Sequence, residues 1–451
     1  MDRLRILLFA PEASPDGICG SLIGYSEAQA LAQLHDVTLL IRPAEEESVR
    51  RKQGALRSVE VVRLHRLDAI FNWVVRSIFK NDYMTHAQSL TAFVRYPYSV
   101  AFEWQAWRQL RARIKAGEFD IALRLLPISA VLPSPIAYFL RGTHVPFVIG
   151  PISGGLPWPS GFRQAQKHKQ WVSGLRGLYR FMPFTRSTYR HATAIITGAS
   201  QTHGEFAGYG EKLFFMLENG VDSSLCSERN RDPESVNGKL ELIFVGGLTP
   251  VKACDIGLRA AATLLRKGLA HFTIVGDGPE RQNLEELIRS LGIEDAVTFC
   301  GMLSHVEAMD RLRSADVLVF PSVRDNNPAV VFEAIAAGVV PVVADFGGPG
   351  DTVRSDVGFR VPLTDEDDVV FQFEKILTGL VQDRENLHCL QQQCVRYAKE
   401  CLTWDAKAQI FTSIMRWALR RGPKPNLPSP KMPQVELMLT RDVEVGSCMD
   451  G

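Results

Sequence analysis

The sequence lacks the patterns that identify metal-binding and secreted proteins. Its eight cysteines form no Cys-x-x-Cys motif and no Cys/His pair at the spacing of a zinc site, so we expect reduced thiols and no structural metal. No run approaches the roughly 18 apolar residues of a membrane-spanning helix. The apolar run before Pro11 is too short for a signal peptide. These absences together predict a cytosolic protein.

Motifs of common nucleotide and hydrolase sites are also absent. There is no GxxxxGK[ST] loop and no GxSxG elbow, and no glycine-rich turn has the form GxGxxG. These motifs bind a nucleoside triphosphate, carry a nucleophilic serine and bind a dinucleotide, respectively. A dinucleotide-dependent oxidoreductase is therefore disfavoured.

The chain has little net charge. It carries 51 Lys and Arg against 50 Asp and Glu over 451 residues, so it lacks the basic surface of a general nucleic-acid binder. The two halves differ in net charge. Residues 1–225 have 26 basic and 18 acidic residues, whereas residues 226–451 have 25 basic and 32 acidic residues. A basic first half and an acidic second half indicate two units with different partners.

Short apolar runs alternate with helical patterns along most of the chain, which predicts parallel sheets covered by helices. Strands are expected at 6–10, 37–41, 59–64, 119–126, 145–150, 192–197, 240–246, 271–276, 296–300, 316–320, 339–344 and 358–361. Helices are expected at 25–34, about 100–116, 252–267, 279–291, 304–314, 328–337 and 365–380, with three more helical segments between 383 and 421.

This alternation predicts two doubly wound α/β domains. Residues 1–225 and 226–402 are expected to form one Rossmann-like domain each, joined by a polar, turn-rich stretch at 215–238. A helix at 403–422 is expected to pack back on the first domain. The tail at 423–451, which begins with several prolines, is expected to be disordered.

The segment after the predicted strand at 316–320 carries the most chemical information. Asn327 and Pro328 supply an N-cap and a first-turn proline for a helix, and the start of a helix binds anions through its free amide groups. Glu333 is the only charge in that helix. Either the hydroxyl groups of a ligand or a neighbouring backbone or Arg group is expected to hydrogen-bond it. Asp325, in the loop, is placed to meet the same ligand.

Two other strand-to-helix turns lie in the same predicted domain. Gly246 and Gly247 allow close approach of a ligand to the backbone, and Lys252 would neutralise a phosphate. A turn of the same kind spans 276–280. A lysine in the first turn of a helix is usually just solvated, so this alternative stays open for Lys252.

In their order along the chain, these segments resemble the C-terminal domain of glycosyltransferase family 4, whose members are retaining GT-B enzymes that use nucleotide-sugar donors. The matching segments are 244–252, 275–280, 297–301, 315–322, 333–338 and 341–345. The resemblance is dense over 240–355 and looser in the first half, through 16–21, Ser200 and 219–222. The stretch 150–159 is similar to a motif of one bacterial branch of the family.

The resemblance implies a GT-B fold, which is α/β with two doubly wound Rossmann-like domains facing a central cleft, followed here by C-terminal helices and a disordered tail. Residues 1–225 would form the acceptor side and residues 226–402 would bind the nucleotide sugar. The family needs no metal, and no cofactor is expected besides the donor substrate.

The resemblance also implies roles for individual residues. Lys252 would contact the donor diphosphate, while Asp325 and Glu333 would occupy the two acidic positions of the E-x7-E signature, facing the sugar and the ribose; these three are the expected catalytic residues. Residues 301–303 would border the base. The other donor-binding positions would be Gly17, Gly20, Gly246, Gly247, Gly301, Met302, Leu303, Asn326, Asn327, Pro328, Ala329 and Val330.

Three positions depart from the family pattern. Gly247 stands where the family often has an Arg that pairs with Lys252 on the diphosphate. Asp325 is one methylene shorter than the usual Glu. The family's N-domain His has no clear counterpart, since His144 precedes the predicted strand at 145–150 instead of following it.

A basic, aromatic stretch lies in the first half. No acidic residue occurs between Asp120 and Glu205, although Lys and Arg occur nine times, and 161–190 adds six aromatic rings. Such a stretch fits either peripheral contact with the inner face of the plasma membrane or a lipid-diphosphate acceptor. A solvated surface with buried rings is the alternative.

The leading hypothesis is a retaining hexosyltransferase. It would move a hexose from a UDP- or GDP-sugar to a glycan or lipid-linked acceptor, in bacterial polysaccharide or glycolipid synthesis, with no nucleic-acid partner. One alternative is a sugar-nucleotide-binding protein with weak or no transferase activity, which Gly247 and Asp325 motivate. Another is a GT-B sugar-nucleotide epimerase, which would form product from the donor alone.

Overall fold

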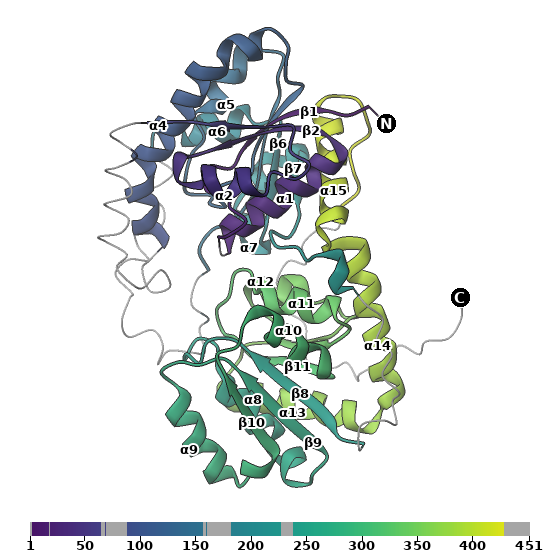
Figure 1. Cartoon of the computed structure of the whole chain (residues 1–451). Helices are drawn as coiled ribbons and strands as arrows, with labels where there is room; N and C mark the ends of the chain where they lie inside the picture. The colour runs from purple at the N-terminus through teal and green to yellow at the C-terminus, as the bar shows by residue number, and fades with distance from the viewer. Residues whose placement is uncertain are drawn as a thin grey trace. The chain divides into compact units, whose positions relative to one another are not determined.

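The computed structural model describes residues 2–17, 19–64, 68, 88–156, 159, 182–226 and 238–427. The chain divides into two compact units (Figure 1). Unit 1 comprises Met1–Gly155, Lys167–Gly220 and Trp404–Ser429, and unit 2 comprises Leu156–Gln166, Val221–Thr403 and Pro430–Gly451. The borders at Gly220 and at Thr403 lie within a few residues of the expected ranges 1–225, 226–402 and 403–422, but Leu156–Gln166 is grouped with unit 2. The expected ranges stay predictions. Most of the tail at 423–451 and of the basic stretch at 161–190 lies outside the described residues.

Unit 1 contains a seven-stranded parallel sheet in the order β3-β2-β1-β4-β5-β6-β7. Its strands are β1 (Arg5–Phe9), β2 (Asp36–Ile41), β3 (Ser58–Val61), β4 (Ile121–Arg124), β5 (Phe147–Ile152), β6 (Ala194–Thr197) and β7 (Leu213–Phe215). Its described helices are α1 (Gly20–Leu34), α2 (Glu46–Arg51), α4 (Gln88–Lys115), α5 (Ile136–Phe139), α6 (Thr185–His191), α7 (Ser200–Glu205) and α15 (Trp404–Ala418), with short 3-10 turns that include η2 (Leu140–Gly142).

The alternation of side chains along the strands explains why both faces of this sheet are covered. In β1, Ile6 and Leu8 point to a cluster that includes residues of α1 and α15, whereas Leu7 and Phe9 point to a cluster formed with α4, α5 and α6. Consecutive residues of a strand face opposite sides. A continuous apolar strand therefore needs helices on both faces.

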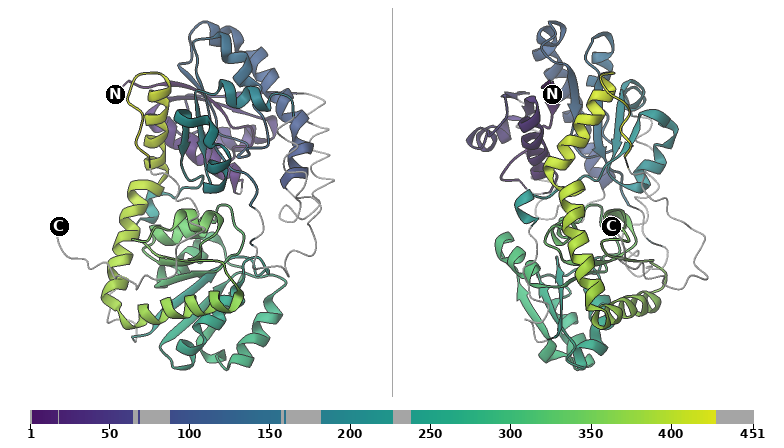
Figure 2. Two further views of the ribbon diagram at one scale, coloured as in Figure 1. Left: turned by 180° about the vertical axis from the view of Figure 1, so that it is seen from behind. Right: turned by 90° about the vertical axis from the view of Figure 1, so that its right-hand side faces the viewer.

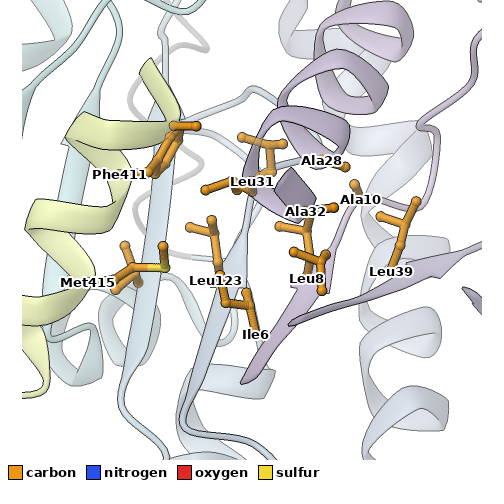
Figure 3. Packing of buried hydrophobic residues seen from close by; sticks show 14 of the residues in the cluster. Ile6, Leu8, Ala10, Ala28, Leu31, Ala32, Leu39, Leu123, Phe411 and Met415 are labelled. Atoms are coloured by element: carbon orange, nitrogen blue, oxygen red, sulfur yellow. The ribbon is translucent and has the colours of Figure 1, made fainter. Parts of the chain in front are cut away.

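Helix α15 belongs to unit 1 although it is the last helix of the described chain (Figures 1 and 2). Phe411 and Met415 are fully buried and point toward Leu31 of α1 and Leu123 of β4 (Figure 3). Burying each such side chain contributes about 1.5–3 kcal/mol. The same helix carries the buried Lys407, which donates to the backbone oxygen of Leu217.

A buried ion pair lies beneath α4 in unit 1. The Nε atom of Arg124, at the end of β4, is 3.6 Å from Oε1 of Glu103 on α4, and both side chains are at most 4% exposed. Glu103 also accepts from the Ser134 hydroxyl at 2.8 Å and from the Ile136 amide at 3.0 Å. Among the described residues no group accepts a hydrogen bond from the Arg124 guanidinium. The negative charge of Glu103 is therefore the main compensation for burying the positive charge of Arg124.

Unit 2 contains a six-stranded parallel sheet in the order β10-β9-β8-β11-β12-β13. Its strands are β8 (Leu240–Val245), β9 (Ala270–Val275), β10 (Val297–Gly301), β11 (Val317–Phe320), β12 (Val340–Ala344) and β13 (Phe359–Val361). Its described helices are α8 (Cys254–Arg266), α9 (Arg281–Leu291), α10 (His305–Ser314), α11 (Ala329–Ala336), α12 (Gly347–Thr352), α13 (Glu366–Gln382) and α14 (Arg384–Tyr397), which a π-helical turn at Ala398–Leu402 follows.

The predicted architecture of two doubly wound α/β sheets is confirmed, and every expected strand is present within a few residues. The expected helix at 100–116 is longer, since α4 begins at Gln88 and contains Pro97. Strand β7 and the short helices α2, α5, α6, α7 and α12 were not expected. No helix in the described ranges is long and apolar enough to cross a lipid bilayer.

Candidate functional site

The strand order of unit 2 reverses between β8 and β11. In doubly wound sheets, ligands bind outside the carboxyl ends of the strands at such a point. The loops that leave these two strands are hydrogen-bonded to each other, because the Val323 amide donates to the Val251 oxygen at 3.0 Å and the Ser322 hydroxyl to the same oxygen at 3.3 Å. Residues from both loops are thus held side by side.

Glycine allows the turn after β8 to pack directly on the turn after β9. Gly276 has a φ of +132°, and a Cβ atom there would lie 2.0 Å from the Gly246 oxygen. The Leu248 amide donates to the Asp277 oxygen at 2.9 Å. A larger residue at position 276 would push these two backbones apart. The approach of a ligand to Gly246 and Gly247 stays a prediction.

Lys252 and Asp325 form an ion pair across the reversal point. The Lys252 ammonium donates to Oδ2 of Asp325 and lies 5.0 Å from the centre of the Phe320 ring. The two side chains are 21% and 16% exposed, so the pair is partly shielded but within reach of a ligand. Two residues that the sequence singled out separately are therefore in direct contact.

The loop at 325–327 is supported by two glycines that sequence analysis missed. The Gly348 amide donates to the Asp325 oxygen at 2.8 Å. A Cβ atom at Gly348 would lie 2.2 Å from the Asn326 oxygen, and one at Gly347 would lie 2.5 Å from the Asp325 oxygen. The Gly-Gly-Pro-Gly sequence at the start of α12 is the feature of the sequence that could have indicated this close packing. It permits the close packing that fixes the backbone of Asp325.

The start of α11 differs from the prediction. The helix begins at Ala329 with Pro328 in the N-cap position, so Asn327 is not its cap, and within the described residues no side chain caps this end. Proline has an extended ψ of 102° here and cannot use a side-chain acceptor. The amides of Ala329 and Val330 are therefore left for another acceptor, as an anion site requires.

Glu333, on α11, is held by a residue that the sequence did not point to. Its Oε1 atom lies 2.9 Å from Nε2 of His305, at the start of α10, and Figure 1 shows these two helices next to each other. The hydrogen bond that the His305 ring donates to Glu333 raises the pKa of His305 above its ordinary value. Among the described residues, neither a backbone group nor an Arg side chain contacts the Glu333 carboxylate, and His305 takes that place.

The residues expected near a base lie beside this pair. Gly301 ends β10 with a φ of +67°, and Met302 and Val306 are 75% and 69% exposed. Leu303 is half-buried. Two strongly exposed apolar side chains next to His305 offer a surface for a planar ring.

Gly17 and Gly20 belong to unit 1. Gly20 is the first residue of α1, and the Gly17 amide donates to the Ser14 oxygen at 3.3 Å. Their part in donor binding stays a prediction.

The cluster in unit 2 combines three kinds of group. A lysine and the amides at the start of α11 can bind an anion, Glu333 can accept from hydroxyl groups, and Met302 and Val306 can contact an apolar ring. A ligand that offers an anion, a pair of hydroxyl groups and a flat ring would match all three kinds of group, and a nucleotide has these features.

Residues 227–399 match the family described as glycosyl transferases group 1. Among related proteins, the glycogen synthase of Mycobacterium tuberculosis is 28% identical over 279 residues, and the D-inositol 3-phosphate glycosyltransferase of Rhodococcus erythropolis is 33% identical over 230. The alignments cover 59% and 49% of this chain. The chain spans 64% and 50% of the length of these curated relatives.

Most of the chain resembles solved structures. The crystal structure of HepE from Anabaena in complex with UDP matches with a TM-score of 0.55 and 17% identity, and the match covers 91% of this chain and 98% of that one. At this identity the likeness concerns the fold, which is the GT-B fold that the resemblance implied. The chain therefore has the fold of the GT-B glycosyltransferases, and its second half matches their group 1 family.

Proposed function

We propose that the protein is a retaining hexosyltransferase of family 4. It moves a hexose from a UDP- or GDP-sugar to a glycan or lipid-linked acceptor, and it serves polysaccharide or glycolipid synthesis in bacteria. The observation that carries the proposal is the contact between Lys252 and Asp325 at the reversal point of the unit 2 sheet. The family match over 227–399 supports it.

In the proposed reaction, the diphosphate of the donor takes the place of Asp325 on Lys252. Negative charge develops on the diphosphate as its bond to the sugar breaks, and Lys252 and the amides of Ala329 and Val330 stabilise that charge. Asp325, released from Lys252, is then available to the hydroxyl groups of the sugar, and Glu333 to those of the ribose. We propose that this chemistry needs no resident metal or cofactor.

A thermal-shift screen of nucleotide sugars tests the donor. A ligand that binds only the native state, at 100 times its dissociation constant, adds about 2.7 kcal/mol to stability. We expect one UDP- or GDP-hexose to raise the melting temperature more than the free sugar or the nucleoside. No shift with any nucleotide sugar would refute the proposed site.

A transfer assay separates the proposal from its alternatives. Release of the nucleoside diphosphate that depends on an added glycan or lipid-linked acceptor is expected for a transferase. Binding without turnover across an acceptor panel would favour a sugar-nucleotide-binding protein, the alternative that Gly247 and Asp325 motivate. A new sugar nucleotide formed from the donor alone would indicate an epimerase.

The affinity for the nucleoside diphosphate is expected to rise with pH. Below the raised pKa of His305, the imidazolium pairs with Glu333 and competes with the ribose; the pairing is lost as pH rises through that pKa. Because the His305 side chain is 70% exposed, we expect only about a two- to fivefold effect. Calorimetric titration from about pH 6 to about pH 8 measures it.

The control for this titration is His305→Gln. The terminal phosphate of the ligand also ionises near pH 6, with a pKa of about 6, and that contribution persists in the variant. The pH dependence should therefore be steeper in the wild type. Equal slopes in the two proteins would contradict a competition between His305 and the ribose.

Adding a second cation at position 247 is expected to strengthen donor binding. A Cβ atom at Gly247 would have Asp277 O, at 4.0 Å, as its nearest neighbour outside the adjoining residues, so the backbone leaves room for a Cβ atom at this exposed position. We expect Gly247→Arg to lower the dissociation constant of the nucleoside diphosphate about three- to tenfold, because a charge-assisted hydrogen bond is added. Gly247→Gln adds a neutral side chain and should change affinity little; an equal gain in both variants would show that charge is not the cause.

A further inference from the structure

Unit 1 carries an exposed surface on which arginines and aromatic rings alternate. On α4, Trp104 is 48% exposed, and the Arg108 guanidinium lies 4.8 Å from the centre of its ring. Tyr138 of α5 is 42% exposed, and the guanidinium of Arg141 in η2 lies 4.7 Å from the centre of its ring. The same arrangement thus occurs twice, on neighbouring elements.

Contacts between rings join these elements into one surface. Trp107 of α4 stacks on Phe139 of α5 at 5.8 Å, and Tyr138 meets His191 of α6 edge-on at 6.3 Å. Figure 1 shows α4, α5 and α6 next to one another in unit 1. Residues spaced by three or four positions share a side of a helix, so Arg111 lies on the same side of α4 as Trp107 and Trp104. We call this surface the basic-aromatic face; it comprises Trp104, Arg108, Arg111, Tyr138, Arg141 and Arg190.

The positive charge of this face is not balanced by carboxylates. In the described parts of the chain, none of its four arginines pairs with an acidic side chain. Of the carboxylates on or beside α4 from residue 103 onward, Glu103 is buried against Arg124, and Glu60 and Glu118 both pair with Arg113. In the sequence, no acidic residue occurs from 121 to 204.

The pKa of a neighbouring histidine is consistent with the gathered charge. Partial burial lowers the pKa of His191, and the cations of Arg141, Arg190 and Lys212 lower it further. Three cations, on η2, on α6 and in the turn before β7, therefore lie close enough to disfavour the charged form of the His191 imidazole.

We propose that the basic-aromatic face binds peripherally to a bilayer that contains anionic phospholipids. Arginines near an anionic surface are attracted to lipid headgroups, and exposed Trp and Tyr rings, with an apolar body and a polar edge, insert at headgroup level. Binding of a soluble polyanion would use the arginines, but it would give no role to the exposed aromatic rings. This proposal involves only unit 1 and does not depend on the donor site of unit 2.

Flotation of the full-length protein with lipid vesicles tests the proposal. We expect binding to vesicles of phosphatidylcholine and phosphatidylglycerol, weak binding to phosphatidylcholine alone, and release at high salt. The double variant Arg108→Glu/Arg141→Glu should bind at least about 25-fold more weakly, since each cation contributes about fivefold. Trp104→Ala should also weaken binding, and more so at high salt, where insertion of the ring dominates.

The matched control is Lys267→Glu/Lys375→Glu, which makes the same change of charge at two exposed lysines of unit 2. It should bind vesicles as the wild type does. All variants should retain the melting temperature of the wild type, and donor hydrolysis in solution should be unchanged.

Three outcomes would overturn the proposal. Equal losses in the test and control variants would mean that only total charge matters. Equal binding to neutral and anionic vesicles would exclude headgroup charge. If polyglutamate or a single-stranded oligonucleotide displaces the protein from vesicles and Trp104→Ala has no effect, the face binds a soluble polyanion instead of a membrane.

Discussion

Replacing Lys252 with alanine is expected to weaken binding of the nucleoside diphosphate about 10- to 100-fold, since a charge-assisted hydrogen bond is worth about 1.5–3 kcal/mol. The loss has two sources. The diphosphate loses its cation, and Asp325, which pairs with Lys252 in the ligand-free protein, is left as an unpaired negative charge facing the ligand. Isothermal titration with UDP and GDP measures the change.

A double variant separates these two sources. Lys252→Ala/Asp325→Asn should regain part of the affinity, because the repulsive carboxylate is gone. Lys267→Ala, at an exposed position of unit 2, serves as the neutral control. Unchanged affinity in Lys252→Ala would rule out the phosphate role and leave the interpretation of a solvated lysine.

The substitution Glu103→Gln is expected to destabilise unit 1 by about 3–5 kcal/mol. Glutamine can still accept from Ser134 and Ile136, but it leaves the fully buried Arg124 guanidinium without its counter-charge. Breaking a buried ion pair by removing one partner is costly because the other charge stays in a poorly polarisable surrounding. Urea denaturation followed by circular dichroism measures the loss.

The double variant Glu103→Gln/Arg124→Met provides the comparison. It removes the uncompensated charge while keeping an apolar side chain of similar length, so most of the lost stability should return. If the single and double variants are equally destabilised, the cost comes from packing of α4 and not from the charge of Arg124.

The strands were predictable because they are continuous apolar runs that alternate with helical patterns. Three of the exceptions have local causes. Strand β7 has only three residues, Leu213–Phe215, too few for a period to show. Helix α12 contains three glycines and a proline among its six residues, and these normally indicate a turn. Pro97 lies inside α4, although an interior proline usually ends a helix.

The sequence singled out the residues of the candidate site but not the contacts between them. The spacing of Asp325 and Glu333 placed both near the start of one helix, and the glycine turns placed Lys252 at the neighbouring strand. Sequence spacing cannot show that Lys252 and Asp325 form a pair or that His305 holds Glu333. These contacts join residues 73 and 28 positions apart, and they depend on how the loops after β8, β10 and β11 pack.

Helix α15 is the last described helix to leave the ribosome, yet it completes the core of the unit whose first strand is made first. About 400 residues separate Leu8 from Phe411, and at roughly 5–20 residues per second their synthesis takes about 20–80 s. During that time the nascent chain exposes the apolar side of α1 that α15 later covers. A stop codon just before residue 404 would leave unit 1 in this state permanently, although every strand of its sheet had been made.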